Sequence, residues 1–274
     1  MNSIVTEVNI GLQVPVHVIH MADTHFTLAD ERDGERKISL AASRVDCFPD
    51  PWETYNAAKK LSEEKGCPIV HTGDFIDFVS EKNLEMVRRF REECDVFYAA
   101  GNHDFSLYCG EADENAEYRN ISLAKVQACH KNDIRMSSRV IGGVNFIALD
   151  DGYFRFDREH IDFVKSEAAK GLPIVLLIHK PIYDANLFEE MKKIWRDKCL
   201  VGVPDEYSKW WSDDEKLEVC PDDVTREAVA YFKNEKMIKA FICGHLHLDY
   251  EGTDEIGRPV ILTATDTVRV LKFI

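Results

Sequence analysis

Ala100-Gly101-Asn102-His103-Asp104 is the stretch from which the rest of the chain can be interpreted. It follows the apolar run 96–99, which predicts a buried strand. Three polar side chains in a row do not suit a hydrophobic core, whereas Asn, His and Asp can ligate metal ions or transfer protons. The stretch therefore predicts a functional loop at the carboxyl end of a strand.

Four other apolar runs end in the same kind of loop. They lead into Asp23-Thr24-His25, Gly73-Asp74-Phe75-Ile76-Asp77, His179-Lys180-Pro181 and Gly244-His245-Leu246-His247. In open α/β sheets, ligands bind outside the carboxyl ends of the strands. Five strand ends that carry His, Asp and Asn predict one shared site, and these residue types favour a metal site.

Length and composition limit the classes of protein to consider. The 274 residues are 45% hydrophobic, which supports a sizeable core, and the charged side chains sum to −15. A general nucleic-acid binder usually carries a basic face, so we expect no extended nucleic-acid surface. No apolar run reaches the about 18 residues of a membrane span, and the N-terminus lacks a signal-peptide pattern. We therefore expect a cytoplasmic protein without a membrane segment.

The cysteines and the lack of linkers add two expectations. None of the eight cysteines forms a CxxC pair, so reduced thiols are expected, and Cys243 is interpreted as a core residue. The sequence contains no repeat, low-complexity segment or Gly/Ser/Pro-rich linker. Residues 1–274 are therefore expected to form a single domain.

The order of the periodic segments predicts an α/β fold with a mixed sheet or two packed sheets. Helices are expected at 52–65, 80–93, 114–131, 157–170 and 222–236, and strands or hairpins at 8–22, 140–149 and 250–274. Two segments match no simple pattern. Residues 27–52 are polar and predict an irregular loop over the mouth of the site, in which any single arginine is interpreted as a solvated surface residue. Residues 182–221 are the least predictable part.

Seven nitrogen and oxygen donors carry the metal prediction. Asp23 and His25 are two residues apart, as are His245 and His247, so each pair can point to one side of an extended chain. The set is completed by Asp74, Asn102 and His179. The absence of a thiolate disfavours a structural zinc site, and the donors suit Mn, Fe, Zn, Co or Ni better than Ca or Mg. Seven donors exceed the need of one tetrahedral ion and suit two ions that share a carboxylate.

These blocks resemble the calcineurin-like metallophosphoesterases. The resemblance rests on Asp23-x-His25, Gly73-Asp74-x-x-Asp77, Gly101-Asn102-His103-Asp104, His179 and Gly244-His245-x-His247. Each block alone is weak, but the five occur in order and each follows a predicted strand. Together they span residues 23–247.

The resemblance implies a fold and a site. The fold would be a four-layer α/β/β/α sandwich of two mixed β-sheets flanked by helices. One ion would be held by Asp23, His25 and His247, the other by Asn102, His179 and His245, with Asp74 between them. A hydroxide between the ions would attack the phosphorus of a phosphate ester. His103 would protonate the leaving oxygen, Asp104 would hold the tautomer of His103, and Asp77 would orient a ligand or a loop amide.

Differences between this sequence and the motifs of two subgroups narrow the choice of subgroup within the family. Protein Ser/Thr phosphatases carry Asp-Arg-Gly where this chain has Asp77-Phe78-Val79, and Glu in place of Asp104. Purple acid phosphatases carry Tyr in place of Asp77. The Gly-Asn-His-Asp form is more similar to small bacterial-type phosphodiesterases and phosphatases. The gap between His25 and Gly73 is longer than is usual for them, so residues 27–52 are interpreted as a specificity insert.

The remaining polar and aromatic residues receive structural interpretations. Structural histidines are expected at His17, His20, His71, His130 and His160. Trp210 and Trp211 are expected to anchor the segment 182–221, although they could wall a substrate pocket. Asp150 and Asp151 are interpreted as turn residues, and Lys180 as a surface lysine.

The sequence thus predicts a dinuclear metal-dependent phosphoesterase that acts on a small phosphate ester. A phosphodiester or nucleotide-type substrate is favoured over a monoester by the subgroup likeness alone. The alternative is a scaffold of the same fold that binds metal but does not catalyse, although no ligand position is substituted here. The sequence leaves open the natural substrate, the identity of the metals and the oligomeric state.

Overall fold

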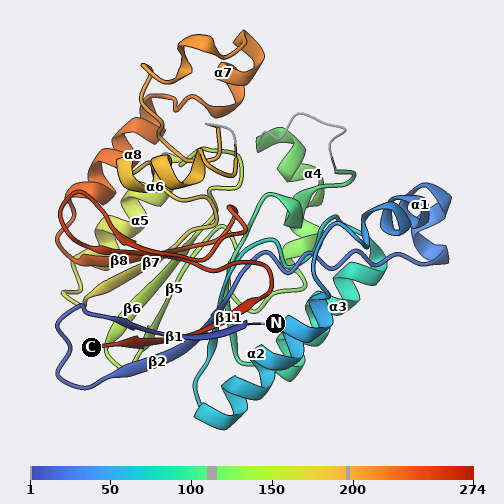
Figure 1. Ribbon diagram of the computed structural model, residues 1–274, viewed down its shortest axis with the longest axis horizontal. Helices are drawn as coiled ribbons and strands as arrows, with labels where there is room; N and C mark the ends of the chain where they lie inside the picture. The colour runs from blue at the N-terminus through green and yellow to red at the C-terminus, as the bar shows by residue number, and fades with distance from the viewer. Residues whose placement is uncertain (1, 110–115, 196–197) are drawn as a thin grey trace.

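The chain forms two mixed β-sheets in the computed structural model, which describes residues 2–109, 116–195 and 198–274 (Figure 1). The first sheet has the order β1 (Asn2–Val8), β11 (Thr267–Phe273), β2 (Val16–Met21), β3 (Ile69–Thr72) and β4 (Val96–Ala99). The second has the order β5 (Met136–Ile141), β6 (Val144–Leu149), β7 (Ile174–Leu177), β8 (Ile238–Cys243), β10 (Pro259–Leu262) and β9 (Tyr250–Thr253). Antiparallel pairing occurs at β11–β2, β5–β6 and β9–β10, and the other pairs are parallel.

Helices cover the outer faces of both sheets. They are α1 (Gly34–Arg44), α2 (Pro51–Lys65), α3 (Glu81–Glu93), α4 (Ala116–Gln127), α5 (Arg158–Ala168), α6 (Ala185–Met191), α7 (Asp213–Val219) and α8 (Asp223–Asn234). Single 3-10 turns occur at Glu31–Asp33, His103–Phe105 and Ser208–Trp210. In Figure 1, α2 and α3 lie on the side of the first sheet, and α5, α6 and α8 on the side of the second.

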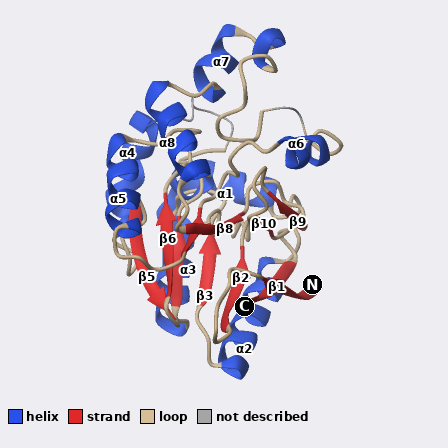
Figure 2. Cartoon of the chain, turned by 90° about the vertical axis from the view of Figure 1, so that its left-hand side faces the viewer, coloured by secondary structure: helices blue, strands red, loops and turns tan. Residues whose placement is uncertain are grey.

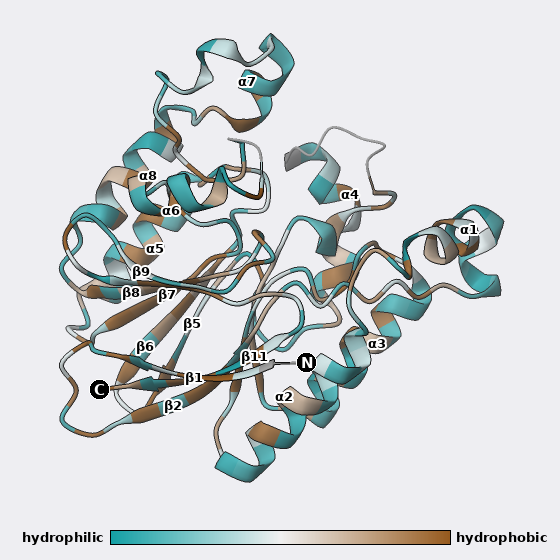
Figure 3. Cartoon of the chain, viewed as in Figure 1, coloured by the Kyte–Doolittle hydropathy of each residue, from teal (hydrophilic) through white to brown (hydrophobic). Residues whose placement is uncertain are grey.

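The alternation of side chains along the strands produces three hydrophobic layers. In β3, Ile69 packs toward α2 and α3, whereas Val70 packs between the sheets. In β6, Phe146 packs between the sheets and Ile147 packs toward α5 and α8. Figure 3 shows the same division, with brown segments in strands such as β2 and β7 and teal over much of α2 and α3. Each sheet is therefore buried on both faces, and the predicted four-layer sandwich is confirmed.

Most predicted elements are confirmed within a few residues. Ser80 caps α3 by accepting a hydrogen bond from the backbone of Asn83, and Gly66 ends α2 in the left-handed conformation. The expectation for 27–52 is wrong, because this segment contains α1; α1 buries no side chain and so has no apolar stripe to reveal it. The first strand begins at Asn2, earlier than expected. Part of the helix expected at 114–131 lies outside the described residues.

The strand register brings the five loops to one edge. Met21, His71 and Tyr98 are paired across β2, β3 and β4, so the loops that follow these strands begin at the same level. The pairs Ala148–Leu177 and Leu177–Ile242 do the same in the second sheet. Figure 2 shows β3 and β6 pointing toward the end of the molecule where α1, α6 and α7 lie. None of the described helices is long and apolar enough to cross a membrane.

Candidate metal centre

Two groups of three donors meet at the shared edge of the sheets. Ligand atoms of Asp23, His25 and His247 lie within 4.8 Å of one another, as do those of Asp74, His179 and His245. The His25 and His247 Nε2 atoms are 3.1 Å apart, and His179 Nε2 is 3.3 Å from His245 Nδ1. These are the two ligand sets that the sequence predicted, apart from Asn102.

Asp74 lies between the two groups. Its Oδ2 atom is 3.0 Å from His179 Nε2 in one group and 3.9 Å from His25 Nε2 in the other. Its Oδ1 atom accepts a hydrogen bond of 2.8 Å from the backbone of His103. A carboxylate with one oxygen facing both sets of donors can bridge two ions.

The side chain of Asn102 contacts a buried lysine that the sequence analysis misplaced. Lys180 donates from Nζ to Asn102 Oδ1 over 2.6 Å and to the carbonyl of Gly152. Its Nζ atom also lies 4.6 Å from the centroid of the Phe154 ring. Lys180 is 1% exposed, so its interpretation as a surface lysine is wrong. The apolar run before His179 indicates a buried segment that extends to Lys180. No sequence pattern shows which polar groups Lys180 contacts.

The backbone at the centre is held in an unusual conformation. Among the described residues, six that are not glycine have positive φ, and five of these are predicted ligands. These five are Asp23, His25, Asp74, His245 and His247, with φ between 50° and 70°. Such conformations cost on the order of 1–3 kcal/mol each and persist where the surrounding structure enforces them, commonly at functional sites. The strain therefore marks the same loops as the ligand chemistry does.

Two glycines allow the loops to approach closely. A Cβ atom on Gly101 would lie 2.2 Å from Asp74 Oδ1, and one on Gly73 would lie 2.5 Å from the backbone nitrogen of Gly101. Gly73 also has φ of +90°, which disfavours other residues. Each glycine is thus required for the contact between the β3 and β4 loops.

Asp77, rather than Asp104, faces the ring of His103. His103 Nδ1 is 3.1 Å from Asp77 Oδ1, which also lies 3.2 Å from His25 Nδ1. Asp104 instead accepts hydrogen bonds from Tyr98 Oη (2.7 Å) and from the backbone of Gly101 (2.8 Å) and Asp74 (3.0 Å). The expected tautomer role of Asp104 is therefore wrong. Its side chain ties the β3 and β4 loops together, because it is adjacent to those amides and not to the imidazole.

Asp151 has a similar supporting contact in the second sheet. Its Oδ1 atom accepts from the backbone of His179 (3.2 Å) and Lys180 (3.1 Å), and burial raises its pKa to about 7. Asp150 accepts from the backbone of Gly152 as a turn residue does, and it also pairs with Arg119. The turn interpretation was therefore incomplete. In the sequence, the adjacent polar pair Asp150-Asp151 at the end of β6 was the feature that could have indicated these supporting contacts.

The five histidines that were assigned structural roles from the sequence make contacts outside the two donor groups. His20 bridges Thr72 (2.9 Å) and Thr263 (2.7 Å), and burial, with the nearby Arg269, lowers its pKa to about 3. His71 is buried beside Thr24, and His160 accepts from the backbone of Asp157 at the start of α5. His130 packs on the Tyr98 ring, and His17 is exposed. None of these rings is among the two donor groups.

The segment 27–52 contributes two side chains to the centre. Arg44 donates to both carboxylate oxygens of Asp77, with Nη2 2.9 Å from Oδ1. The Phe48 ring stacks on the His25 ring at 4.0 Å between centroids, with an interplanar angle of 2°. The surface interpretation is therefore wrong for Arg44. This arginine is a support for Asp77, and through it for His25 and His103.

Replacing Arg44 by alanine should weaken the binding of a divalent ion at the first donor group by about tenfold, because partners of metal ligands have effects of about this size. Isothermal titration with Mn²⁺ would measure the change. Arg32→Ala is the matched control, since Arg32 lies in the same segment but pairs with Asp30 and Glu85. Equal Mn²⁺ affinity in the two variants would contradict the supporting role of Arg44.

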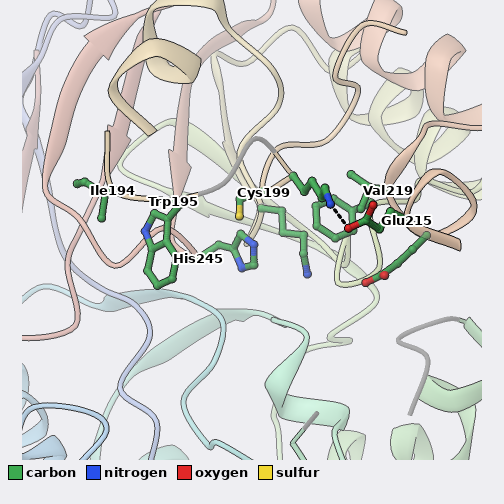
Figure 4. Close-up of a pocket in the computed structure, with 10 residues that line it drawn as sticks. Ile194, Trp195, Cys199, Glu215, Val219 and His245 are labelled. Carbon is green, nitrogen blue, oxygen red and sulfur yellow. Dashed lines mark hydrogen bonds and ion pairs between the residues drawn. The ribbon is translucent and has the colours of Figure 1, made fainter. Parts of the chain in front are cut away.

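A cavity opens beside the second donor group. Its volume is about 690 Å³, and its walls include His245, Lys180, Phe154, Trp195 and Glu218. Figure 4 shows Trp195 and His245 toward one end and Glu215 and Val219 toward the other. The wall comes mainly from the segment 182–221. Trp211 of that segment is 5% exposed and anchors it as expected, whereas Trp210 is 92% exposed and does not.

The electrostatics of the centre favour cations. Burial opposes a positive charge on His179, yet Asp74 and Asp23 raise its pKa to about 9. Asp23, Asp74 and Asp77 are each at most 1% exposed, so their charges must be compensated by nearby cationic groups. Two buried carboxylates, four imidazoles and one amide in two adjacent groups fit two divalent transition ions.

Comparisons with known proteins agree with this geometry. The family model described as calcineurin-like phosphoesterase matches residues 16–249. A dimetal phosphatase from Danio rerio has a similar structure, with a TM-score of 0.50 and 14% identity; the match covers 91% of this chain and 87% of that one. This likeness shows the fold. No curated protein sequence matches the chain.

Two other solved structures are similar over part of their length. A purple acid phosphatase from yellow lupin (Lupinus luteus) gives a TM-score of 0.49 and 14% identity over 95% of this chain and 44% of its own. A 5'-nucleotidase from Candida albicans gives 0.46 and 11% over 91% and 45%. This chain therefore spans about half the length of these two proteins.

Proposed function

The chain belongs to the calcineurin-like phosphoesterase family, which consists of metal-dependent phosphoester hydrolases, and from this we propose that its two donor groups form a dinuclear centre that hydrolyses a small phosphate ester. The observation that carries the proposal is the position of Asp74 between two complete donor groups, with His103 beside it. Ligand atoms of His25, Asp74 and His103 lie within 4.8 Å of one another.

In this proposal, the donors are assigned to two ions. Asp23, His25 and His247 would hold the first ion, and Asn102, His179 and His245 the second, with Asp74 shared. When bound, two such ions lower the pKa of a water molecule and neutralise charge on the phosphate. Asp77 orients His25, Asp151 fixes the backbone at His179, and the Asp23 carboxylate accepts from the backbone of His245 at 2.9 Å. These contacts hold the ligand atoms in place before substrate arrives.

His103 is the proton donor to the leaving oxygen in this proposal. Burial would lower the pKa of His103, but the charges of Asp74 and Asp77 raise it well above the usual value. Its side chain is 23% exposed, so substrate can reach it. With Nδ1 facing Asp77, the other ring nitrogen is free of that contact and can deliver a proton.

Lys180 provides a fixed positive charge between Asn102 and the cavity. Its ammonium group holds the side-chain oxygen of Asn102 and lies in the cavity wall with His245. A phosphate oxygen that faces this wall would meet a cation that is already oriented. Lys180 is therefore included in the proposed site, and its position directly after the predicted ligand His179 is consistent with a phosphate contact.

The cavity favours an ester with a sizeable substituent, and we propose a phosphodiester or nucleotide-type substrate. Trp195 is 41% exposed in the cavity wall, and its indole nitrogen donates to the carbonyl of Leu246 at 2.6 Å. The ring is thus fixed beside the loop that carries the predicted ligands His245 and His247, with its centroid 5.8 Å from that of the His247 ring. Aromatic faces stack on nucleobases without strong preference for one base.

Replacing Trp195 by alanine should raise KM for a nucleotide ester by about tenfold, because stacking is worth about 1–3 kcal/mol per base. KM for glycerol phosphate, which has no aromatic ring to stack, should stay within about twofold, by the same reasoning. Trp210→Ala is the control, since this exposed tryptophan lies in the same segment. An equal rise in KM for both esters would contradict stacking on Trp195.

Deletion of 34–44 without any change of substrate choice would contradict a specificity role for the segment 27–52.

The alternative is a scaffold of the same fold that holds metal without catalysis. Every predicted ligand is present in the described residues, and the partner of His103 is in place. These observations favour catalysis. Metal binding without hydrolysis of any phosphate ester would favour the scaffold.

A further inference from the structure

A third group of metal-ligating side chains lies beside the dinuclear centre. Ligand atoms of Asp77, His103 and Cys109 lie within 4.8 Å of one another. Neither donor group of the dinuclear centre includes any of these three. From this group we propose a separate site for one thiophilic divalent cation, such as Zn²⁺, whose occupation inhibits the hydrolase.

The distances between the three side chains match those between ligands of one tetrahedral ion. Cys109 Sγ is 3.8 Å from His103 Nδ1 and 3.4 Å from Asp77 Oδ2, and His103 Nδ1 is 3.1 Å from Asp77 Oδ1. Bond lengths of about 2.3 Å to sulfur and about 2.0–2.1 Å to nitrogen and oxygen give edges of about 3.6 Å and 3.3 Å in a tetrahedron. The two carboxylate contacts use different oxygens of Asp77, so an ion held by all three side chains would require this carboxylate, which Arg44 also contacts, to rotate. The fourth position would remain for water.

The chemistry of the donors separates this site from the dinuclear centre. The dinuclear centre offers only nitrogen and oxygen, whereas this group adds the sulfur of Cys109. Thiolates select zinc and other soft ions, while Mn²⁺ prefers oxygen and nitrogen. Loading of the centre with Mn²⁺ therefore leaves the third group available to Zn²⁺.

The site is accessible from solvent, and its charge is suitable for a divalent cation. Cys109 and His103 are partly exposed, so an ion can enter from solvent. Asp77 offers a carboxylate, and Arg44 donates to both of its oxygens. Arg44 competes with the ion for this carboxylate, but release of the thiol proton on binding adds a negative charge that offsets the arginine.

Occupation of the site would act on His103. A cation on His103 Nδ1 replaces the proton that now faces Asp77 and prevents the ring from becoming an imidazolium. The ring would keep a proton on Nε2, but loss of this proton would leave an imidazolate, so the ring would be a much weaker acid toward the leaving oxygen. This inhibitory effect rests on the proposed function, whereas binding of the cation does not.

Co²⁺ provides a test of binding that does not depend on activity. A thiolate bound to Co²⁺ gives a ligand-to-metal charge-transfer band in the near ultraviolet, and the nitrogen and oxygen donors of the dinuclear centre give none. Addition of Co²⁺ to the Mn²⁺-loaded protein should produce this band with one equivalent bound. Cys109→Ser should abolish the band, and Cys67→Ser, at a partly buried cysteine after α2, should retain it.

Inhibition is tested in the same preparations. Zn²⁺ should inhibit the Mn²⁺-loaded enzyme at least tenfold more strongly than the Cys109→Ser variant, and a chelator weak enough to leave Mn²⁺ bound should reverse the effect. Absence of the band, or a band unaffected by Cys109→Ser, would overturn the site. A band of the expected kind with equal Zn²⁺ inhibition of both proteins would overturn the inhibitory role. Failure of the proposed function is distinct, since the protein would then show the band but hydrolyse no ester before Zn²⁺ is added.

Discussion

Asp74→Asn should lower kcat/KM for a phosphate ester by at least about 10³-fold, which corresponds to a barrier increase on the order of 4 kcal/mol. Asp74 lies closer to both donor groups than Asp23 does: its Oδ2 atom is 3.0 Å from His179 and 3.9 Å from His25, whereas Asp23 Oδ1 is 4.0 Å from each of these two rings. Asparagine keeps the shape of the side chain but removes the charge that two cations would share. We expect the purified variant to retain at most one tightly bound ion.

Metal analysis and steady-state kinetics together check this result. Asp213→Asn is a suitable control, because Asp213 is fully exposed at the start of α7 and its change removes the same charge. It should leave both metal content and kcat/KM unchanged. An Asp74→Asn protein that holds two ions and retains most of its activity would show that the ions do not depend on a shared carboxylate.

His103→Ala should lower kcat by about 10²–10⁴-fold while both ions remain bound, because a positioned general acid contributes about that factor. The His103 ring contacts Asp77, and its backbone N–H donates to Asp74 Oδ1, but its side chain belongs to neither ligand group in the proposed assignment. The loss should be smallest for esters with good leaving groups. An ester such as p-nitrophenyl phosphate, whose leaving group departs without a proton, should therefore retain the most activity.

The dependence on the leaving group separates proton donation from a structural effect. A general loss of structure would lower kcat equally for all esters and would reduce metal content. His17→Ala is the matched control, since His17 is exposed in β2 and away from the donor groups. Equal losses for good and poor leaving groups in His103→Ala would contradict its role as the acid.

The fold and the clustering of the candidate metal ligands were predictable because each depends on local pattern. Apolar runs gave the strands, and the polar residues at their carboxyl ends gave the donors, which the register of β2, β3 and β4 then aligned. The helix α1 was missed because its residues are all at least partly exposed and show no buried stripe. This helix is held by polar contacts to other segments, from Lys37 to the carbonyl of Val79 and from Arg44 to Asp77, which sequence periodicity does not record.

The supporting contacts were not predictable, because they join residues far apart in the chain. Arg44 meets Asp77, and Lys180 meets Asn102, only once the sheets are assembled. The role expected for Asp104 was wrong for the same reason, since adjacency to His103 in sequence does not place its carboxylate on the ring. The left-handed backbone at Asp23, Asp74 and His245 is likewise a property of the folded loops.

The central claim is that the two donor groups form a catalytic dinuclear centre, and hydrolysis of a chromogenic phosphodiester and its monoester by Mn²⁺-loaded protein tests it most directly. Turnover that a strong chelator abolishes, that Mn²⁺ restores and that His103→Ala reduces is the predicted result, with the diester favoured. The measurement would include the nucleotide ester used for Trp195, so that a selective enzyme is not missed. Protein that holds two ions per chain but turns over none of these esters would contradict the claim and favour the scaffold.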